Sequence, residues 1–330
     1  MPPIIATNSL QAGIQSAISD FFRQEFPVYK EQQETLLHFL PFSSIRRADY
    51  GFKDRVPLPK PWPYGKPRTY QGWQDRKVTI GVYPFDLTQL WSGFDEDDDQ
   101  LDGPSGIQKH VSSAMERYMQ LADILYSEYL TNAAVYNYWG LQNAYDGVGL
   151  FSAVDGAGDD RYGVVGGNIY TGSTVGSTAH IISDIQGVKR RFLEFTEPVT
   201  GAPLIDPGKV DYNDMLFIIP TELEGKFNMI ADQKTIYSEQ AINTAQDNVL
   251  VGKVHYKVNQ YLTDADNWFV LLKHKFWKPF LYRAPQDVKQ FYADMSNSDM
   301  ARERNNRASY SHIRCGLGVF APFTIVKVNN

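Results

Sequence analysis

The chain has 330 residues, enough for two or three domains or for one domain with large excursions, and its 43% hydrophobic and 14% aromatic residues can fill a substantial core. A chain of this composition is not expected to be disordered overall. Its net charge of −6 argues against a protein whose main task is to grip phosphates, because that task needs a concentrated basic surface.

The N-terminal third combines one predicted helix with a proline-rich segment. Residues 10–26 carry apolar side chains at helical spacing, and Pro27 ends the pattern. The segment from Val56 to Pro67 cannot form a regular helix or an inner strand, because proline lacks an amide hydrogen. Its prolines are Pro57, Pro59, Pro61, Pro63 and Pro67. We expect an extended arm that lies across another surface, for which a neighbouring subunit is one candidate.

A strand and a long helix follow this arm. Lys77 to Tyr83 alternates in the manner of a β-strand, with Val78 and Ile80 on one face. The acidic run Asp95–Asp99 then leads to Gly103 and Pro104, which break the chain before a helix. The apolar residues of its predicted buried face are Ile107, Val111, Ala114, Met115, Tyr118, Leu121, Ala122, Leu125 and Tyr129. We expect a rod of roughly 37 Å, with Glu116, Arg117 and Glu128 among the residues on a solvated or partner-facing surface.

The remainder alternates between helices and strands. An aromatic-rich turn ends at Asp146-Gly147 and precedes a glycine-rich passage. A second helix is predicted from Ser177 to Phe195, and Met215–Ile219 reads as a fully buried strand. Thr221-Glu222-Leu223-Glu224 predicts a capping box for a helix through Ile230. Further strands are expected at 249–262, 267–274, 276–284 and within 310–327, which gives an α+β fold class.

No familiar catalytic or cofactor motif is present. The sequence lacks a nucleophile elbow, a phosphate-binding loop and a dinucleotide fingerprint. The six histidines are dispersed, without metal-binding spacing, at His38, His110, His180, His255, His274 and His312. We therefore predict no catalytic, cofactor-binding or metal-binding residues, and no cofactor.

The single cysteine and the lengths of the apolar segments indicate the cellular compartment in which the protein is made. Because Cys315 is the single cysteine, neither an intrachain disulfide nor a cysteine zinc site can form. Its position in a predicted strand favours a role in packing. The start of the chain lacks a basic segment followed by an apolar run, and no stretch reaches about 18 apolar residues. We expect neither a secretory signal nor a membrane span, and synthesis in a reducing cytoplasm.

Three groups of charged residues have competing interpretations. The run 95–99 could hold calcium, but it lacks the glycine and glutamate of an EF-hand loop, and a solvated turn is favoured. Glu194 and Glu197 could form a glycosidase pair, although exposed charges are the commoner outcome. Two basic groups could contact nucleic acid or form ion pairs between subunits. These groups are Lys189-Arg190-Arg191, and Arg302, Arg304, Arg307 and Arg314.

The order of the parts resembles the phage Mu type major head subunit, and so the tailed-phage major capsid protein of the Hong Kong 97-type fold. Individually weak motifs carry this resemblance, in order, over most of residues 70–285. They are Trp73-Gln74-Asp75-Arg76, Val78-Thr79-Ile80, Asp97-Asp98, Gly103, Ala144-Tyr145-Asp146-Gly147, Leu150-Phe151, Phe217–Glu224, Trp268–Leu271 and Lys278–Tyr282. The chain departs from the Mu-like pattern at Gly156-Ala157-Gly158, where an aspartate-histidine element is expected, and over its first 60 residues.

The resemblance implies an assignment of parts. Residues 1–50 would be an N-terminal arm, and 51–100 an extended β loop that reaches a neighbour. Residues 101–160 and 266–330 would form the peripheral domain with its long spine helix, and 161–265 the axial domain. The implied partners are other copies of the chain in hexamers and pentamers, with scaffold, portal and decoration proteins, and packaged DNA bound without sequence specificity. No membrane is implied.

Three functions follow in order of preference. The first is a major capsid protein, a structural protein of the virion, that self-assembles into the icosahedral head enclosing the double-stranded DNA of a tailed bacteriophage. Such a protein is not an enzyme, and it would assemble in the cytoplasm of the bacterial host. The second is another virion or binding module, such as a tail or lectin-like protein, and the third a carbohydrate-active hydrolase. The long helix argues against the second, and the third requires a cleft with two carboxyl groups.

Overall fold

The computed structural model describes residues 30–31, 33–40, 47–53, 75–92, 105–137, 140–173, 177–197, 201–237, 245–283, 289–293 and 306–330. Several sequence predictions lie outside these ranges: the helix at 10–26, the proline-rich segment, the acidic run 95–99, the Gly103-Pro104 break, and Arg302 and Arg304. The order of helices and strands confirms the α+β class.

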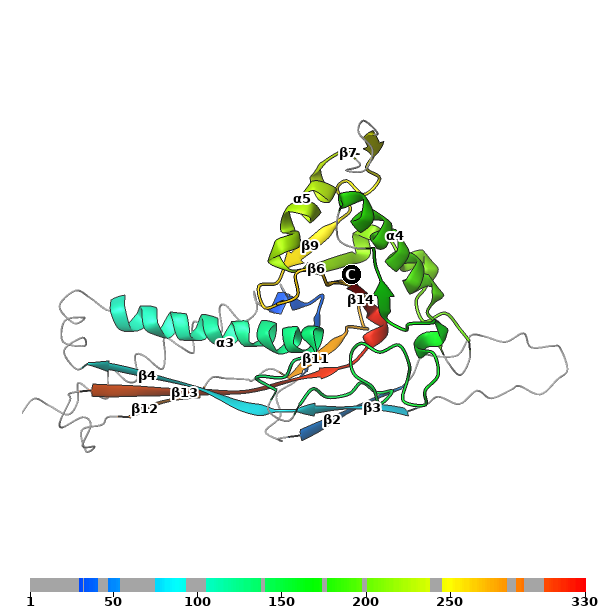
Figure 1. The fold of residues 1–330 in the computed structure, drawn as a ribbon. Helices are drawn as coiled ribbons and strands as arrows, with labels where there is room; N and C mark the ends of the chain where they lie inside the picture. Colours follow the sequence, from blue (N-terminus) through cyan, green and yellow to red (C-terminus); the bar gives the residue numbers. More distant parts are fainter. Residues whose placement is uncertain are drawn as a thin grey trace, which may run out of the picture.

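One sheet extends below a long helix (Figure 1). Its strand order is β1-β11-β13-β12, and β4 pairs with β13 as well. The strands are β1 (Leu37–Leu40), β4 (Tyr83–Ser92), β11 (Phe280–Arg283), β12 (Lys289–Ala293) and β13 (Asn306–Val319). β13 is the common member, since β11 pairs with its last residues and β4 with its first ten. The sheet thus joins segments from both ends of the chain.

A second five-stranded sheet has the order β5-β14-β10-β6-β9. Its strands are β5 (Ile169–Thr171), β6 (Met215–Ile219), β9 (His255–Val258), β10 (Trp268–Leu272) and β14 (Ile325–Asn329). In β10, Phe269 and Leu271 face one hydrophobic cluster while Trp268 and Val270 face the other. Because both faces of this sheet are covered, its central strands are apolar without alternation.

Helices cover both faces of the second sheet. α4 (Thr178–Glu194) and α5 (Glu224–Asp232) pack on one side in a cluster that includes Ile185, Phe192 and Phe227. α3 (Ser105–Thr131) contributes Leu125, Tyr129 and its neighbours to the cluster on the other side. Figure 1 shows α3 running along β4 and β13, away from α4 and α5. The first sheet and α3 thus form an extended layer, and the second sheet with α4 and α5 forms a compact layer beside it.

Two small hairpins complete the fold. β2 (Arg47–Lys53) pairs antiparallel with β3 (Asp75–Gly81), and β7 (Thr235–Tyr237) pairs with β8 (Ala245–Asp247) at the apex of Figure 1. Short 3-10 turns lie at Arg161–Gly163, Pro207–Lys209, Tyr212–Asp214, Thr221–Leu223 and Pro322–Thr324. Val78 and Ile80 of β3 are buried, as their alternation predicts.

The long helix is formed as predicted, and the described part of its buried face agrees with the prediction. The side chains of Ile107, Val111, Ala114 and Met115 lie outside the described residues. Tyr118, Leu121 and Ala122 are buried like Leu125 and Tyr129, and Glu116 and Arg117 are exposed. Glu128, however, was predicted on the solvated surface and is only 6% exposed. It is buried because its carboxylate accepts hydrogen bonds from the amides of the turn that ends the helix.

Two other local predictions are wrong. The capping box is not formed, because a 3-10 turn at Thr221–Leu223 precedes α5, and Thr221 Oγ1 donates to Glu222 Oε2 instead. The strand predicted at 249–262 is limited to β9. Its first part is a turn, in which Gly252 has a φ of 69° and the Lys253 amide donates to Leu250.

The sheets cut across the part boundaries expected from the resemblance. β1 belongs to the range assigned to an arm, yet Leu36 and Leu37 are buried in the core. β4, in the range assigned to the extended loop, pairs along β13. β10 and β14 lie in the range 266–330, but they pair in the sheet that holds β5, β6 and β9.

Candidate functional site

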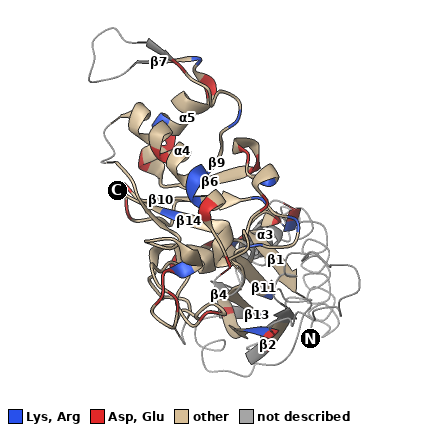
Figure 2. Cartoon of the chain, turned by 90° about the vertical axis from the view of Figure 1, so that its right-hand side faces the viewer, with Lys and Arg blue, Asp and Glu red and all other residues tan. Residues whose placement is uncertain are grey.

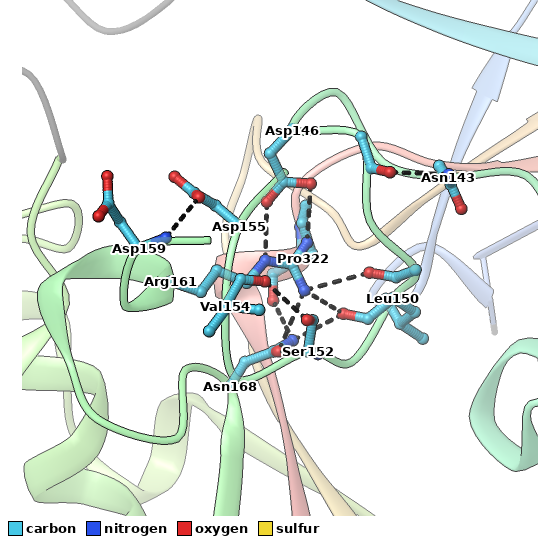
Figure 3. A network of polar contacts seen from close by, with 12 residues as sticks. Asn143, Asp146, Leu150, Ser152, Val154, Asp155, Asp159, Arg161, Asn168 and Pro322 are labelled. Carbon is cyan, nitrogen blue, oxygen red and sulfur yellow. Dashed lines mark hydrogen bonds and ion pairs between the residues drawn. The ribbon is translucent and has the colours of Figure 1, made fainter. Parts of the chain in front are cut away.

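The most extensive polar network in the described residues surrounds Arg161, which is fully buried (Figure 3). Its guanidinium donates to both carboxylate oxygens of Asp146, from Nε at 2.7 Å and from Nη2 at 3.0 Å. Nη1 donates to the carbonyl oxygens of Gly149 and Leu150 and to Asn168 Oδ1, at 2.9–3.2 Å. This paired, bidentate geometry is the form in which a buried arginine is tolerated.

Asn168 extends the network to the C-terminal segment. Its side-chain Nδ2 donates to the carbonyl oxygens of Leu150, Pro322 and Ile325, and its Oδ1 accepts from the Ser152 amide. The network therefore ties the turn after α3 to the beginning of β5 and to the chain entering β14. It joins the loop that follows α3 to the edge of the compact sheet, and its polar groups bond to one another rather than to an open cavity.

A positive φ and a close backbone approach explain two glycines of this region. Gly147 has a φ of 82° in the Asp146-Gly147 turn. At Gly167, which has a φ of 54°, a Cβ atom would lie 2.2 Å from the Ser152 carbonyl oxygen. The glycine-rich passage thus lets three loops meet around one arginine.

A second buried carboxylate fixes the end of α3. Glu128 Oε1 accepts hydrogen bonds from the amides of Val135 and Tyr136, and Oε2 accepts from the amide and the side chain of Asn137. These bonds occupy the carboxylate in holding a turn. Glu128 therefore has a structural role.

The structure does not assemble the candidate catalytic residues into a site. Glu194 is exposed at the end of α4, while Glu197 lies in the following turn, where its amide donates to Ala202. The histidines whose side chains are described are dispersed: His38, His180, His255 and His312 lie on four different strands or helices, and His274 lies in the loop after β10. Within the described ranges, no three histidine, cysteine or acidic side chains are grouped to hold a metal ion.

Cys315 lies in β13 and is fully buried. Burial raises the pKa of its thiol to about 12. A thiol that stays protonated at neutral pH is a poor nucleophile, so the environment of Cys315 suits a packing residue.

The basic group on α4 has partners in its own chain. Lys189 Nζ lies 3.6 Å from Asp211 Oδ1 and 4.1 Å from the centre of the Tyr212 ring. Arg191 Nη1 donates to the Val165 carbonyl. Arg190 is exposed beside a shallow hollow of about 600 Å³ between α4 and the loop at 163–165. On the side seen in Figure 2, basic and acidic residues are interspersed over α4 and α5.

The other basic group is only partly described. Arg314 is exposed on β13, and Arg307 lies opposite Trp91 of β4 in the backbone register. The described chain contains no helix that is long and apolar enough to cross a membrane.

Comparisons with known proteins identify the fold. No protein-family model and no curated protein matches the chain. Among solved structures it is similar to the bacteriophage PhiM1 mature capsid, with 11% identity, 89% of this chain and 85% of that chain covered, and a TM-score of 0.54. The capsid of an empty gene transfer agent particle gives 13% identity, 90% and 89% coverage and a TM-score of 0.55.

A virus-like particle from Pyrococcus furiosus is also similar, with 9% identity, 96% and 98% coverage and a TM-score of 0.52. The chain has the Hong Kong 97-type capsid fold. This confirms the predicted fold class over about nine-tenths of the chain. The narrower resemblance to the Mu type subunit stays a prediction.

Sequence reasoning missed the residues that organise this Hong Kong 97-type fold. Asp146 was noted as part of a motif, but Arg161 and Asn168 were not singled out. A single arginine in a glycine-rich passage resembles many surface arginines. The signal that could have found it is Asp146 itself, since an acidic residue in a buried aromatic turn needs a partner.

Proposed function

We propose that the chain is a major capsid protein, a structural component of the virion and not an enzyme. Copies of it assemble into hexamers and pentamers that form the icosahedral head around the double-stranded DNA of a tailed bacteriophage. The observation that carries the proposal is the fold, which matches capsid subunits over nearly the full length of both chains.

The division into parts belongs to the same proposal. α3 is the spine helix of a peripheral domain formed by residues 101–160 and 266–330, and residues 161–265 form the axial domain. Because β10 and β14 pair with β6 and β5, the peripheral range also supplies strands to the axial sheet. Residues 51–100 form the extended loop, whose described base is the β2–β3 hairpin.

The remaining partners are part of the proposal too. Scaffold, portal and decoration proteins bind the assembled or assembling shell, and packaged DNA lies against its inner surface without sequence-specific contacts. Assembly takes place in the bacterial cytoplasm. The interspersed charges in Figure 2 are consistent with weak DNA contact, since tight binding requires a continuous basic surface.

Negative-stain microscopy of the full chain tests the function. We expect closed shells or capsomers when the chain is expressed in bacteria, alone or with the neighbouring structural proteins of its phage. A chain that remains strictly monomeric under all of these conditions would contradict the proposal. Capsomers without closed shells would support assembly into oligomers and would indicate that a scaffold protein is missing.

A further inference from the structure

The loop between β10 and β11, residues 273–278, is firmly held at both ends. The Lys273 amide donates to the Asp214 carbonyl at 2.6 Å. The Trp277 ring stacks on Phe320, with 5.4 Å between ring centres. Lys278 is buried, and its Nζ lies 3.7 Å from Glu34 Oε1. The loop therefore has little freedom at either end.

The side chain of His274 holds the middle of this loop by hydrogen bonds to the loop backbone. His274 Nδ1 accepts hydrogen bonds from the amides of Phe276 at 3.1 Å and Trp277 at 3.0 Å. An imidazole nitrogen accepts only when it carries no proton, so the loop is fixed by the neutral form of His274. This geometry holds the Phe276 ring 68% exposed, with Lys275 Nζ 5.6 Å from the ring centre.

A large exposed ring on a rigid loop is typical of an interaction surface. Fixing Phe276 in water lowers solubility without adding to the core, whereas a ring already in its bound geometry loses little entropy on binding. Single exposed apolar residues are common. Among the described residues, however, Phe276 is the most exposed aromatic side chain, and a cation lies beside its ring. The exposed Phe276 ring on this fixed loop therefore indicates a surface that binds another molecule.

The surroundings of the ring favour another copy of the chain over nucleic acid. Lys273 Nζ donates to the Asn213 carbonyl and Lys278 is buried beside Glu34, so within the described part of the chain Lys275 is the cation that lies against the ring. Phosphate binding needs several cations together. One lysine beside an aromatic ring instead suits an apolar patch with an acidic edge, and this chain has 38 acidic against 32 basic residues.

The loop also lies next to the hairpin that forms the base of the extended loop. Phe320, on which Trp277 stacks, makes an edge contact with Tyr50 of β2 at 5.7 Å. We propose that Phe276 and Lys275 dock on a second copy of this chain and form a contact between subunits of the shell. This inference rests on the proposed function and adds a specific contact to it.

Photo-crosslinking identifies the molecule that contacts Phe276. Phe276 is replaced by p-benzoyl-phenylalanine in the full chain, and assembled particles are irradiated and digested for mass spectrometry. We expect a product of two chains, joined from position 276 to a peptide of another copy. Crosslinks that form only to nucleic acid, only within one chain, or not at all would overturn the docking.

Variants test the energetic role. Phe276→Ser should raise the protein concentration needed for assembly roughly tenfold or more, as expected for an aromatic anchor, while the subunit stays folded. Val249→Ser is the matched control, because Val249 is also 60% exposed on a held turn, where Asn248 Oδ1 accepts from the Leu250 amide, but it carries no aromatic ring. Phe276→Ser particles that assemble like the control would refute the inference and leave the capsid function intact. Wild-type chains that never assemble would instead contradict the function.

A further pair of variants separates the ring from the loop geometry. His274→Ala should weaken assembly by freeing the loop, and His274→Asn should restore it, because an asparagine oxygen can accept the same two amides. Equal assembly by both variants would show that the fixed geometry is irrelevant and would overturn the argument.

Discussion

Arg161 is held in the core by five hydrogen bonds, and its charge is balanced by one carboxylate. Removing one partner of such a pair leaves the other charge buried and unpaired, which costs about 3–5 kcal/mol. The residues joined by the network lie in three separate stretches of the chain. Its loss should therefore destabilise all three stretches together.

We expect Asp146→Ala to lower the free energy of unfolding by about 3–5 kcal/mol, measured by urea denaturation. Lys77→Ala is the control, because Lys77 also forms a 2.7 Å ion pair, with Asp49, but both side chains are at least half exposed. The control should cost less than about 1 kcal/mol. Equal losses in the two variants would show that burial does not determine the effect.

The burial of Cys315 predicts how the stability of the fold changes at alkaline pH. Because burial raises the pKa of its thiol from 9.0 to about 12, the folded state keeps a proton that the unfolded state loses first. Its contribution to stability is complete below about pH 9 and is lost as the pH rises toward 12.

Cys315→Ala should therefore lose less stability than the wild type between pH 8 and pH 10.5, as measured by urea midpoints at each pH. The tyrosines titrate in both proteins, so the difference isolates the thiol. Assembly at neutral pH should be unaffected, because the side chain only packs. Loss of shells in the alanine variant at unchanged stability would contradict this interpretation.

At the scale of elements, the crossing of β3 and β13 depends on a glycine. A Cβ atom on Gly316 would lie 1.9 Å from the Gly81 carbonyl oxygen, so the two strands could not keep their present distance. This crossing positions the β2–β3 hairpin relative to the main sheet. The position of the hairpin is thus set at its base.

Gly316→Ala should destabilise the subunit by roughly 1–3 kcal/mol and speed hydrogen exchange at residues 75–81. Gly149→Ala is the control, because a Cβ atom at Gly149 would meet nothing within 4 Å. Unchanged exchange in Gly316→Ala would mean that the strands separate without consequence.

The N-terminal region gives a second prediction at this scale. Gln33 Nε2 donates to Asp123 of α3, and its Oε1 accepts from Lys257 of β9. β1 pairs with β11, and Leu36 and Leu37 are fully enclosed. Residues 33–40 are therefore packed into the core, within the range that the family resemblance assigns to an N-terminal arm.

Removal of residues 1–40 should lower the free energy of unfolding by at least about 3 kcal/mol more than removal of residues 1–29, because two buried leucines and an edge strand are lost in addition. Circular dichroism and urea denaturation of both truncations measure the difference. Similar midpoints would show that β1 is dispensable.

These elements also show which features the sequence could predict. α3, α4 and β6 follow from local periodicity, and the structure confirms them within a few residues. β1 was hidden because its partner β11 is distant in the sequence and its own pattern is only four residues long. Glu128 and Arg161 were missed because burial of a charge depends on partners that no spacing rule reveals.

For the whole molecule, the proposed shell requires the extended loop. β3 carries the buried residues Val78 and Ile80, so a deletion that includes it would damage the core. We therefore expect replacement of residues 55–73 by a short Gly-Ser linker to leave a folded subunit that forms no closed shells. Circular dichroism and negative-stain microscopy measure the two outcomes. Normal particles from this variant would exclude a role of the loop in closing the shell.

The long-range pairing of the main sheet has a consequence for the timing of synthesis. β1 can pair only after β11 has emerged from the ribosome, about 240 residues later, and β4 must wait for β13. At about 5–20 residues per second this delay is on the order of 10–50 s. The main sheet therefore stays incomplete until the last part of the chain has been made. The order of synthesis thus sets the earliest time at which the subunit can finish folding.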